Sequence, residues 1–496
     1  MKHPTMTPAQ KNSPLMAGGL TLLVLGTVLG TSLCGCALHK PPSHQAIVDR
    51  AVPKAMPLPP TWSASADTGN VSDDWVKSFK DEGLEVVVRE AIANNLDLRQ
   101  SAARVEAARQ SVIVVGSKLK PQVAGNIGGA STVSSKNNST DQFQSNTEYA
   151  AVAWELDVWG RLRSQRAASQ ETYEATALDY AFARQSLAAT TARSWYLTIE
   201  SRQLLELTEQ SVIIYKELLE LVKIRQAAGK VSELDVAEAS YQLNEAQSQL
   251  TIAQGVYSET RRALEILIGR YPAAELAVVE AFAPLPPLVA PGLPSSLLER
   301  RPDIVAAEHQ VLAAFRNQQA AKMALLPSFV LNVEGGRLSD RILSLLDLNP
   351  WLIHSVVGML VPIYQGGALQ AQVKIATAQQ EQSIAYFGSV VLRAFGEVEV
   401  ALTNSQLLAE RLPHAENALS DHTEAVQLAN LRYKAGKMDL LSVLQLQEAQ
   451  IQSQATLIRL RNTQLANRIT LHLALGGSFD SLPATTFPPA TAAKKP

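Results

Sequence analysis

Two short segments of the sequence place charged side chains in nearly the same order around a glycine. "RQAAGKVSELDVAEA" begins at Arg225 and "RYKAGKMDLLSVLQL" begins at Arg432. Carboxylates attract cations and repel anions, so the acidic residues near these turns are candidates for a functional site. The candidates follow the Ala-Gly-Lys triplets and are Glu233, Asp235, Glu238 and Asp439.

These acidic residues also have a simpler interpretation. The dipole of a helix favours an acid in its first turn, so each carboxylate can be a solvated charge at a helix start. Basic residues stand beside both glycines and could pair with the acids. They are Arg225, Lys230, Arg432 and Lys437.

The rest of the sequence contains no pattern typical of an enzyme. The eight histidines show no ligand spacing, and the two glycine turns lack the further glycine and the Lys-Ser/Thr pair of a phosphate loop. The only cysteines are Cys34 and Cys36. A net charge of −2 does not indicate the excess of basic residues that is typical of nucleic-acid-binding proteins. We expect no enzymatic activity, cofactor, metal or nucleic-acid partner.

The N-terminal sequence has the pattern of a targeting segment. Lys2, His3 and Lys11 precede an apolar stretch over 16–33, and "LCGC" follows it. This arrangement resembles the bacterial lipobox, which would make residues 1–35 a signal peptide and Cys36 the diacylated first residue of the mature chain. Ala37 after the cysteine would then imply release to the outer membrane. A plain signal peptide or a membrane anchor is the alternative, but the stretch is short for a transmembrane helix.

The chain contains a two-fold internal repeat. Four pairs of landmarks recur at an offset of 206 or 207 residues: Gly229 and Gly436, Asp97 and Asp303, Pro121 and Pro327, and Gly269 and Gly476. Such an offset, kept along the chain, indicates a tandem duplication of one unit. The two glycine turns are therefore two copies of the same feature.

Each copy predicts the same series of elements. A helix over 84–119 or 294–325 ends before a proline, and two extended segments follow it. A helix over 161–228 or 368–435 comes next, and at 1.5 Å per residue it would be roughly 100 Å long. After the glycine turn, a helix over 231–268 carries a coiled-coil track that begins at Val236, Ala239 and Leu243. Pro413 predicts a kink in the second long helix.

The extended segments alternate in polarity. Val152, Trp154 and Leu156 fall on one face of the first copy, and Phe329, Leu331 and Val333 on one face of the second. Membrane-barrel strands and half-buried soluble strands share this alternation. The links over 134–146 and 335–350 are predicted to be exposed loops. Four strands cannot close a membrane barrel, so a spanning protein would have to oligomerise.

Several longer motifs carry a family resemblance that covers about residues 75–477. They are "WVKSFKDEGLEVVVREAIANNLDLRQSAARVEAAR", "WELDVWGRLR", "GKVSELDV", "GLPSSLLERRPDIVAAE", "VPIYQGG" and "RYKAGKMDLLSVL". Together they resemble the TolC/NodT-type outer-membrane efflux channels, in their lipoprotein branch. The resemblance implies a mainly α fold with a β-barrel part. Three chains would form a long-helix α-barrel in the periplasm and a 12-stranded transmembrane β-barrel.

The resemblance also implies a function and partners. The chain would be a homotrimeric exit duct in the outer membrane that passes small toxic compounds or drugs. A periplasmic adaptor and an inner-membrane transporter, expected to be of RND type, would complete the pump. The two turns become the periplasmic tips, with adaptor-docking candidates at Arg225, Gly229, Lys230, Arg432, Gly436 and Lys437. In the implied trimer, the acidic residues near the turns would repeat around a narrowing axis and could form a gate, which the neighbouring basic residues could hold closed. The family often carries an acid where Met438 and Gln445 stand here, which shifts the gate assignment toward Asp235 and Asp439.

The expected domain boundaries follow from the repeat and the resemblance. They are a signal peptide over 1–35, a lipidated equatorial segment over 36–74, repeats over 75–270 and 293–477 joined by a linker over 271–292, and a disordered tail over 478–496. Two other functions fit parts of the sequence. The chain could be the exit duct of a protein or peptide secretion system, or a coiled-coil spacer lipoprotein without a pore.

Overall fold

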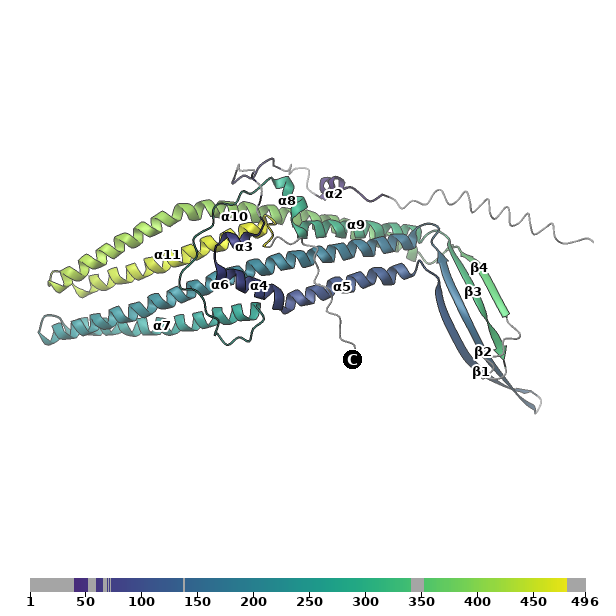
Figure 1. Cartoon of the computed structure of the whole chain (residues 1–496), viewed down its shortest axis with the longest axis horizontal. Coiled ribbons are helices and arrows are strands. Elements are labelled where there is room, and N and C mark those ends of the chain that lie inside the picture. Colours follow the sequence, from purple (N-terminus) through teal and green to yellow (C-terminus); the bar gives the residue numbers. More distant parts are fainter. Residues whose placement is uncertain are drawn as a thin grey trace, which may run out of the picture. The chain divides into compact units, whose positions relative to one another are not determined.

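The computed structural model describes residues 40–51, 59–65, 69, 71, 73–136, 139–339 and 352–479. The signal segment, Cys36 and the tail from residue 480 lie outside these residues. The described chain is mainly helical and has one four-stranded sheet (Figure 1). It divides into two compact units. The sheet unit takes the described residues of 1–42, 111–170 and 312–381, and the helical unit takes those of 43–110, 171–311 and 382–496.

The sheet is antiparallel throughout, in the order β1-β2-β3-β4. Its strands are β1 (Gln122–Lys136), β2 (Ser139–Leu156), β3 (Ser328–Ser339) and β4 (Leu352–Leu360). Val152 of β2 lies opposite Val333 of β3. Directly opposed residues point to the same face of a sheet, and successive residues alternate between faces. The predicted alternation of both copies is therefore confirmed, and the register places the two apolar sets on one face.

We call this side the apolar face. Its members include Val123, Ile127, Val152, Trp154, Leu156, Phe329, Leu331, Val333, Ile353, Val357 and Met359. The opposite, polar face carries Gln122, Asn126, Glu155, Asn332, Glu334 and His354.

The loop predicted over 134–146 is wrong for most of its length. β1 continues to Lys136, β2 begins at Ser139, and these two residues are paired. The prediction relied on polarity, but backbone hydrogen bonds in an antiparallel hairpin do not depend on apolar side chains. In the second copy β3 continues to Ser339, and residues 340–351 lie outside the described residues.

The helices repeat as predicted, and their lengths confirm the duplication. The first copy contains α4 (Glu82–Asn94), α5 (Leu96–Ser117), α6 (Arg161–Ala227) and α7 (Glu233–Leu267). The second contains α8 (Pro294–Arg300), α9 (Pro302–Met323), α10 (Ala368–Lys434) and α11 (Leu440–Ala474). Both long helices have 67 residues, and the helices after the glycine turns both have 35. α2 (His44–Ala51) and α3 (Trp75–Ser78) precede the first copy.

The first helix of each copy is broken into two, where the sequence predicted one. Asn95 is extended, with ψ of 128°, and its side-chain oxygen accepts a hydrogen bond from the Leu98 N–H at 2.9 Å. It thus caps α5. Arg301 is also extended, with ψ of 118°. It precedes Pro302, and proline disfavours the helical conformation in the residue before it.

The helical unit packs its long helices into a common core. Near the glycine turns, buried side chains of α6, α7, α10 and α11 form one cluster that includes Val222, Ala239, Ala429 and Val443. Ala239, which belongs to the predicted coiled-coil track, is thus buried in contact with neighbouring helices. α10 is helical without interruption through Pro413. Among the described helices, none combines the length and apolar composition of a membrane span.

The segment that precedes the first copy is fixed to α10. Glu399 accepts hydrogen bonds from the backbone N–H groups of Ser63 and Ala64 at 2.8 and 3.1 Å. Two turns further along α10, the Gln406 amide donates to the Ala64 carbonyl at 2.7 Å. These three bonds hold an otherwise irregular segment on the helical unit.

Candidate functional sites at the helix turns and the strand–helix junction

The first glycine turn joins α6 to α7 through two linked caps. Gly229 has φ of 67°, and the Lys230 N–H donates to the Arg225 carbonyl at 2.9 Å. This is the hydrogen bond of a Schellman motif, in which a left-handed glycine ends a helix. Ser232 then caps α7 and forms a capping box with Asp235. Asp235 accepts from the Ser232 N–H at 2.8 Å and from its hydroxyl at 2.7 Å.

The second turn repeats this arrangement with one change. Gly436 has φ of 71°, and the Lys437 N–H donates to the Arg432 carbonyl at 2.9 Å. Asp439 is itself the cap of α11 and accepts from the Ser442 N–H and hydroxyl, both at 2.8 Å. These bonds from Ser442 lower the pKa of Asp439. Asp235 and Asp439, the two favoured gate candidates, thus take part in helix caps. This agrees with the simpler interpretation, in which each acid stabilises a helix start.

One cation joins the two turns. The Arg225 guanidinium donates to the Tyr433 carbonyl at 2.5 Å and lies over the Tyr433 ring, 4.4 Å from its centre. Tyr433 is 2% exposed, and its hydroxyl has no hydrogen-bond partner among the described residues. Burial raises the pKa of Tyr433, the charge of Arg225 lowers it, and the charge of Asp235 raises it.

The other charged candidates remain on the surface. Lys230, Glu233, Arg432 and Lys437 are exposed, and Glu238 is partly exposed. Within the described part of the chain, these side chains form no ion pair with each other. Among the predicted site residues of the first turn, Arg225 is the one that contacts the second copy, through Tyr433. The sequence did not identify Tyr433 as its partner, although it stands in the quoted "RYKAGK" segment.

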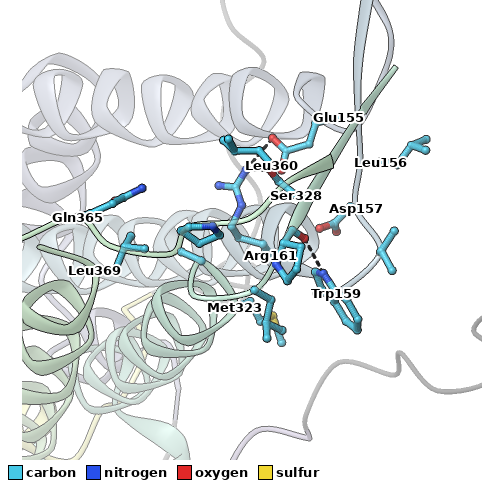
Figure 2. A pocket seen from close by; sticks show the side chains of 15 residues that line it. Glu155, Leu156, Asp157, Trp159, Arg161, Met323, Ser328, Leu360, Gln365 and Leu369 are labelled. Atoms are coloured by element: carbon cyan, nitrogen blue, oxygen red, sulfur yellow. Dashed lines mark hydrogen bonds and ion pairs between the residues drawn. The ribbon is translucent and has the colours of Figure 1, made fainter. Parts of the chain in front are cut away.

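A second polar site lies in the sheet unit, where β2 leads into α6. Glu155 and Arg161 form an ion pair with both carboxylate oxygens 2.6 and 2.7 Å from Arg161 Nη2. Figure 2 shows these two side chains facing each other, whereas Leu156 points away from them. Asp157 accepts from the backbone N–H groups of Leu162 and Arg163, each at 2.9 Å. The carboxylate therefore satisfies two N–H groups at the start of α6.

A small cavity adjoins this ion pair. Its volume is about 210 Å³, and its lining includes Glu155, Arg161, Met323, Gln365 and Leu369. On the same junction, the Trp159 indole N–H donates to the Pro327 carbonyl at 2.7 Å. Segments that are far apart in the sequence therefore meet where the strands end.

The "ERRPDI" motif has a structural role that the sequence did not indicate. Arg301 is 2% exposed and donates to both carboxylate oxygens of Asp303, at 2.9 and 2.8 Å. It also donates to Glu397 of α10 at 2.6 Å and to the Ala474 carbonyl of α11 at 3.3 Å. One guanidinium thus joins the break between α8 and α9 to two other helices.

Comparison with known proteins identifies the family. Residues 87–270 and 293–477 match the family described as outer membrane efflux protein. The pyoverdine export outer membrane protein OpmQ of Pseudomonas putida is 30% identical over 464 residues, which cover 91% of this chain and 97% of OpmQ. The antibiotic efflux pump outer membrane protein ArpC of Pseudomonas putida is 30% identical over 470 residues, 93% of this chain and 95% of ArpC.

A solved structure agrees with these matches. A crystal structure of CusC, from a study of its folding and transmembrane channel formation, matches this chain with a TM-score of 0.78 and 26% sequence identity. The match covers 88% of this chain and 99% of the CusC chain. Because the family match covers both copies of the repeat, it accounts for most of the chain rather than one segment. It also places the chain among transport ducts and not among enzymes. The chain belongs to the outer membrane efflux protein family.

Proposed function

We propose that this chain is the outer-membrane exit duct of a tripartite efflux pump. The observation that carries the proposal is the family match over both repeats, together with a sheet that places most of the large apolar strand residues of both repeats on one face. An apolar face of this kind suits contact with lipid, and the polar face suits contact with water.

The duct is proposed to be a homotrimer anchored by a lipid on Cys36. Each chain contributes four strands, so three chains supply the 12 strands of a closed barrel, whereas four strands alone fall below the minimum. The long helices of three chains would form the periplasmic tube. Membership of the family supports this assembly.

The glycine turns are the proposed contact with the periplasmic adaptor. They carry exposed cations at equivalent positions, Lys230 in the first turn and Lys437 in the second. Exposed charges of one sign at the end of paired helices suit an adaptor surface of opposite charge. An inner-membrane transporter of RND type would supply the energy.

Cargo selection is assigned to the transporter and not to the duct. The relatives named for pyoverdine export and for antibiotic efflux are each 30% identical to this chain. Equal similarity to ducts with different cargoes supports a passive role for this chain. We propose small toxic compounds as its cargo.

The gate is proposed at the same turns. Arg225 ties the end of α10 to the end of α6 and would hold the closed arrangement of one chain. Asp235, Asp439, Glu233 and Glu238 would form carboxylate rings in a trimer, and such rings favour cations.

Single-channel conductance of the purified protein in a planar bilayer tests the duct and the gate together. The wild type should give small, discrete, cation-selective steps. Asp235→Asn with Asp439→Asn should lose cation selectivity, because asparagine removes the charge but can still cap a helix. Arg225→Gln should enlarge the steps or raise the open fraction.

The matched control is Glu217→Gln with Glu259→Gln, which removes two exposed carboxylates of α6 and α7 away from the turns. This variant should conduct as the wild type does. Unchanged selectivity in the aspartate variant would rule out the gate assignment and keep the duct. No steps from trimeric protein, with or without Arg225→Gln, would contradict the duct itself.

A further inference from the structure

Basic side chains gather in the sheet unit where the four strands meet the helices. The segments 116–122, 154–170, 318–328 and 359–369 contain six basic residues and only two acidic ones, Glu155 and Asp157. Their net charge is therefore +4, although the whole chain has a net charge of −2. We call the six residues the basic collar: Lys118, Lys120, Arg161, Arg163, Arg166 and Lys322.

Four of the six residues of the basic collar have no compensating charge. Arg161 pairs with Glu155, and Arg163 Nε lies 3.1 Å from Asp157 Oδ2. Lys118, Lys120, Arg166 and Lys322 are exposed, and no ion pair joins them to any residue that the structure describes. Neighbouring like charges repel each other, so four unpaired cations in one region favour an anionic partner.

Large apolar and aromatic residues are exposed at the same junction. Ile363 is 93% exposed, Tyr364 is 86% exposed and Trp159 is 38% exposed. The indole N–H of Trp159 is satisfied by the Pro327 carbonyl, so its ring edge is fixed at the strand ends. Tryptophan and tyrosine with nearby lysine and arginine are typical of the boundary between lipid and water.

The collar also begins where the apolar face ends. In the antiparallel order, the starts of β1 and β3 and the ends of β2 and β4 lie at one end of the sheet. Lys120 stands two residues before β1, and Arg161 five residues after β2. Figure 2 shows this end, where Leu156 of the apolar face points away from the Glu155–Arg161 ion pair. An apolar surface that is continuous with a cationic rim matches a lipid with an anionic headgroup more closely than a protein surface.

We propose that the basic collar binds the headgroups of anionic phospholipids, with the exposed aromatic and aliphatic residues beside the acyl chains. The inference rests on the proposed location of the sheet in the outer membrane. Lys118, Lys120 and Arg166 are the principal phosphate contacts, because Arg161 and Arg163 are already paired and Lys322 donates to the Gln318 side-chain oxygen at 3.2 Å. The phospholipid would fix the depth at which the strand–helix junction sits in the membrane.

Native mass spectrometry of the detergent-solubilised full chain tests this directly. The protein is titrated with phosphatidylglycerol or with phosphatidylcholine of the same acyl chains, and bound lipids are counted. The wild type should bind phosphatidylglycerol more tightly. Each cation near a lipid surface contributes about fivefold, so Lys118→Gln, Lys120→Gln and Arg166→Gln together should weaken phosphatidylglycerol binding about a hundredfold. Phosphatidylcholine binding should not change.

Two further variants separate the site from the total charge. Lys118→Arg, Lys120→Arg and Arg166→Lys together keep the charge and should keep the preference. Lys230→Gln, Arg432→Gln and Lys437→Gln remove the same charge at the glycine turns and should leave the preference unchanged. Equal binding of both lipids by the wild type would overturn the proposal. The proposal would also be overturned if the triple glutamine variant of the collar kept the preference for phosphatidylglycerol. The same would follow if the turn variant lost this preference as fully as the collar variant.

The result is distinguishable from a failure of the proposed function. Conductance of the triple glutamine variant in a phosphatidylcholine bilayer should equal that of the wild type, because the collar acts on anionic lipid. A wild type that prefers phosphatidylglycerol but never conducts would contradict the duct and keep the collar. A wild type that conducts but shows no lipid preference would support the duct and contradict the lipid-binding role of the collar.

Discussion

Trp154 of β2 lies directly opposite Leu331 of β3, although 177 positions separate them in the sequence. One residue comes from each copy of the repeat, so this pair joins the two copies within a single sheet. Aromatic and branched residues that face each other across strands stabilise a sheet by about 0.2–1 kcal/mol per pair. The same pairing produces the apolar face on which the proposed membrane contact depends.

A charge on the apolar face should impair membrane insertion. Leu331 stands three residues after the start of β3, so Leu331→Arg should cost more than the about 0–1 kcal/mol of an arginine at the membrane boundary and less than the about 2–4 kcal/mol at the bilayer midplane, because arginine loses hydration with depth. The measurement is the amount of heat-sensitive trimer extracted from the outer membrane. Asn332→Arg is the matched control, because it adds the same charge one residue away on the polar face. Equal losses in both variants would contradict the orientation of the sheet.

Removal of the cap of α7 should loosen the first turn locally. Ser232→Ala deletes the hydroxyl that accepts the Asp235 N–H at 3.3 Å and should cost about 1 kcal/mol. Hydrogen exchange in the first turn of α7 should therefore be about fivefold faster, since 1.4 kcal/mol corresponds to tenfold. Ser248→Ala, in the exposed middle of α7, should leave this exchange unchanged. Faster exchange in both variants would argue against a specific role for the cap.

Loss of Arg301 should destabilise the helical unit strongly. Arg301→Met leaves Asp303 and Glu397 without their buried partner, and breaking such a pair costs about 3–5 kcal/mol. Arg300→Met is the control. Its ion pair with Asp73 at 2.6 Å is largely solvent-exposed and should contribute about 0–1 kcal/mol. Thermal unfolding of the two variants measures the difference, and similar midpoints would contradict the role assigned to Arg301.

Acid should weaken the helical unit through His472. This residue is 1% exposed and stacks on Trp75 with ring centres 5.6 Å apart, and neither ring nitrogen has a partner among the described residues. Burial, aided by the charge of Arg468, lowers the pKa of His472 from 6.5 to about 4. The unfolded chain therefore binds the proton more tightly than the folded chain does between these values.

The stability that His472 contributes is consequently complete above pH 6.5 and is lost as the pH falls toward 4. The loss should be about 1.4 kcal/mol per pH unit in that window. Unfolding midpoints measured from pH 7.5 to pH 4 should fall less steeply in His472→Leu. The exposed His414→Leu should follow the wild type. Identical slopes for all three proteins would disprove the effect.

Much of the secondary structure could be predicted because its signals are local. Proline ends the first helix of each copy, and a left-handed glycine ends the later helices, so both boundaries depend on backbone conformations near one residue. The duplication was evident for the same reason, since these markers recur at a constant offset. The break at Arg301 also had a local signal, the following Pro302, but the helical periodicity around it concealed that signal.

The tertiary structure decided which distant residues meet. The strand alternation alone fits a membrane sheet and a soluble sheet equally, and only the register places Val152 and Val333 on one face. Likewise, Arg225 could pair with an acid of its own turn by sequence, yet it binds the Tyr433 carbonyl and ring from the other copy. The sequence determines which charged residues stand near each turn. The residues that they contact depend on packing between segments some 200 residues apart, and no local preference of the chain encodes that packing.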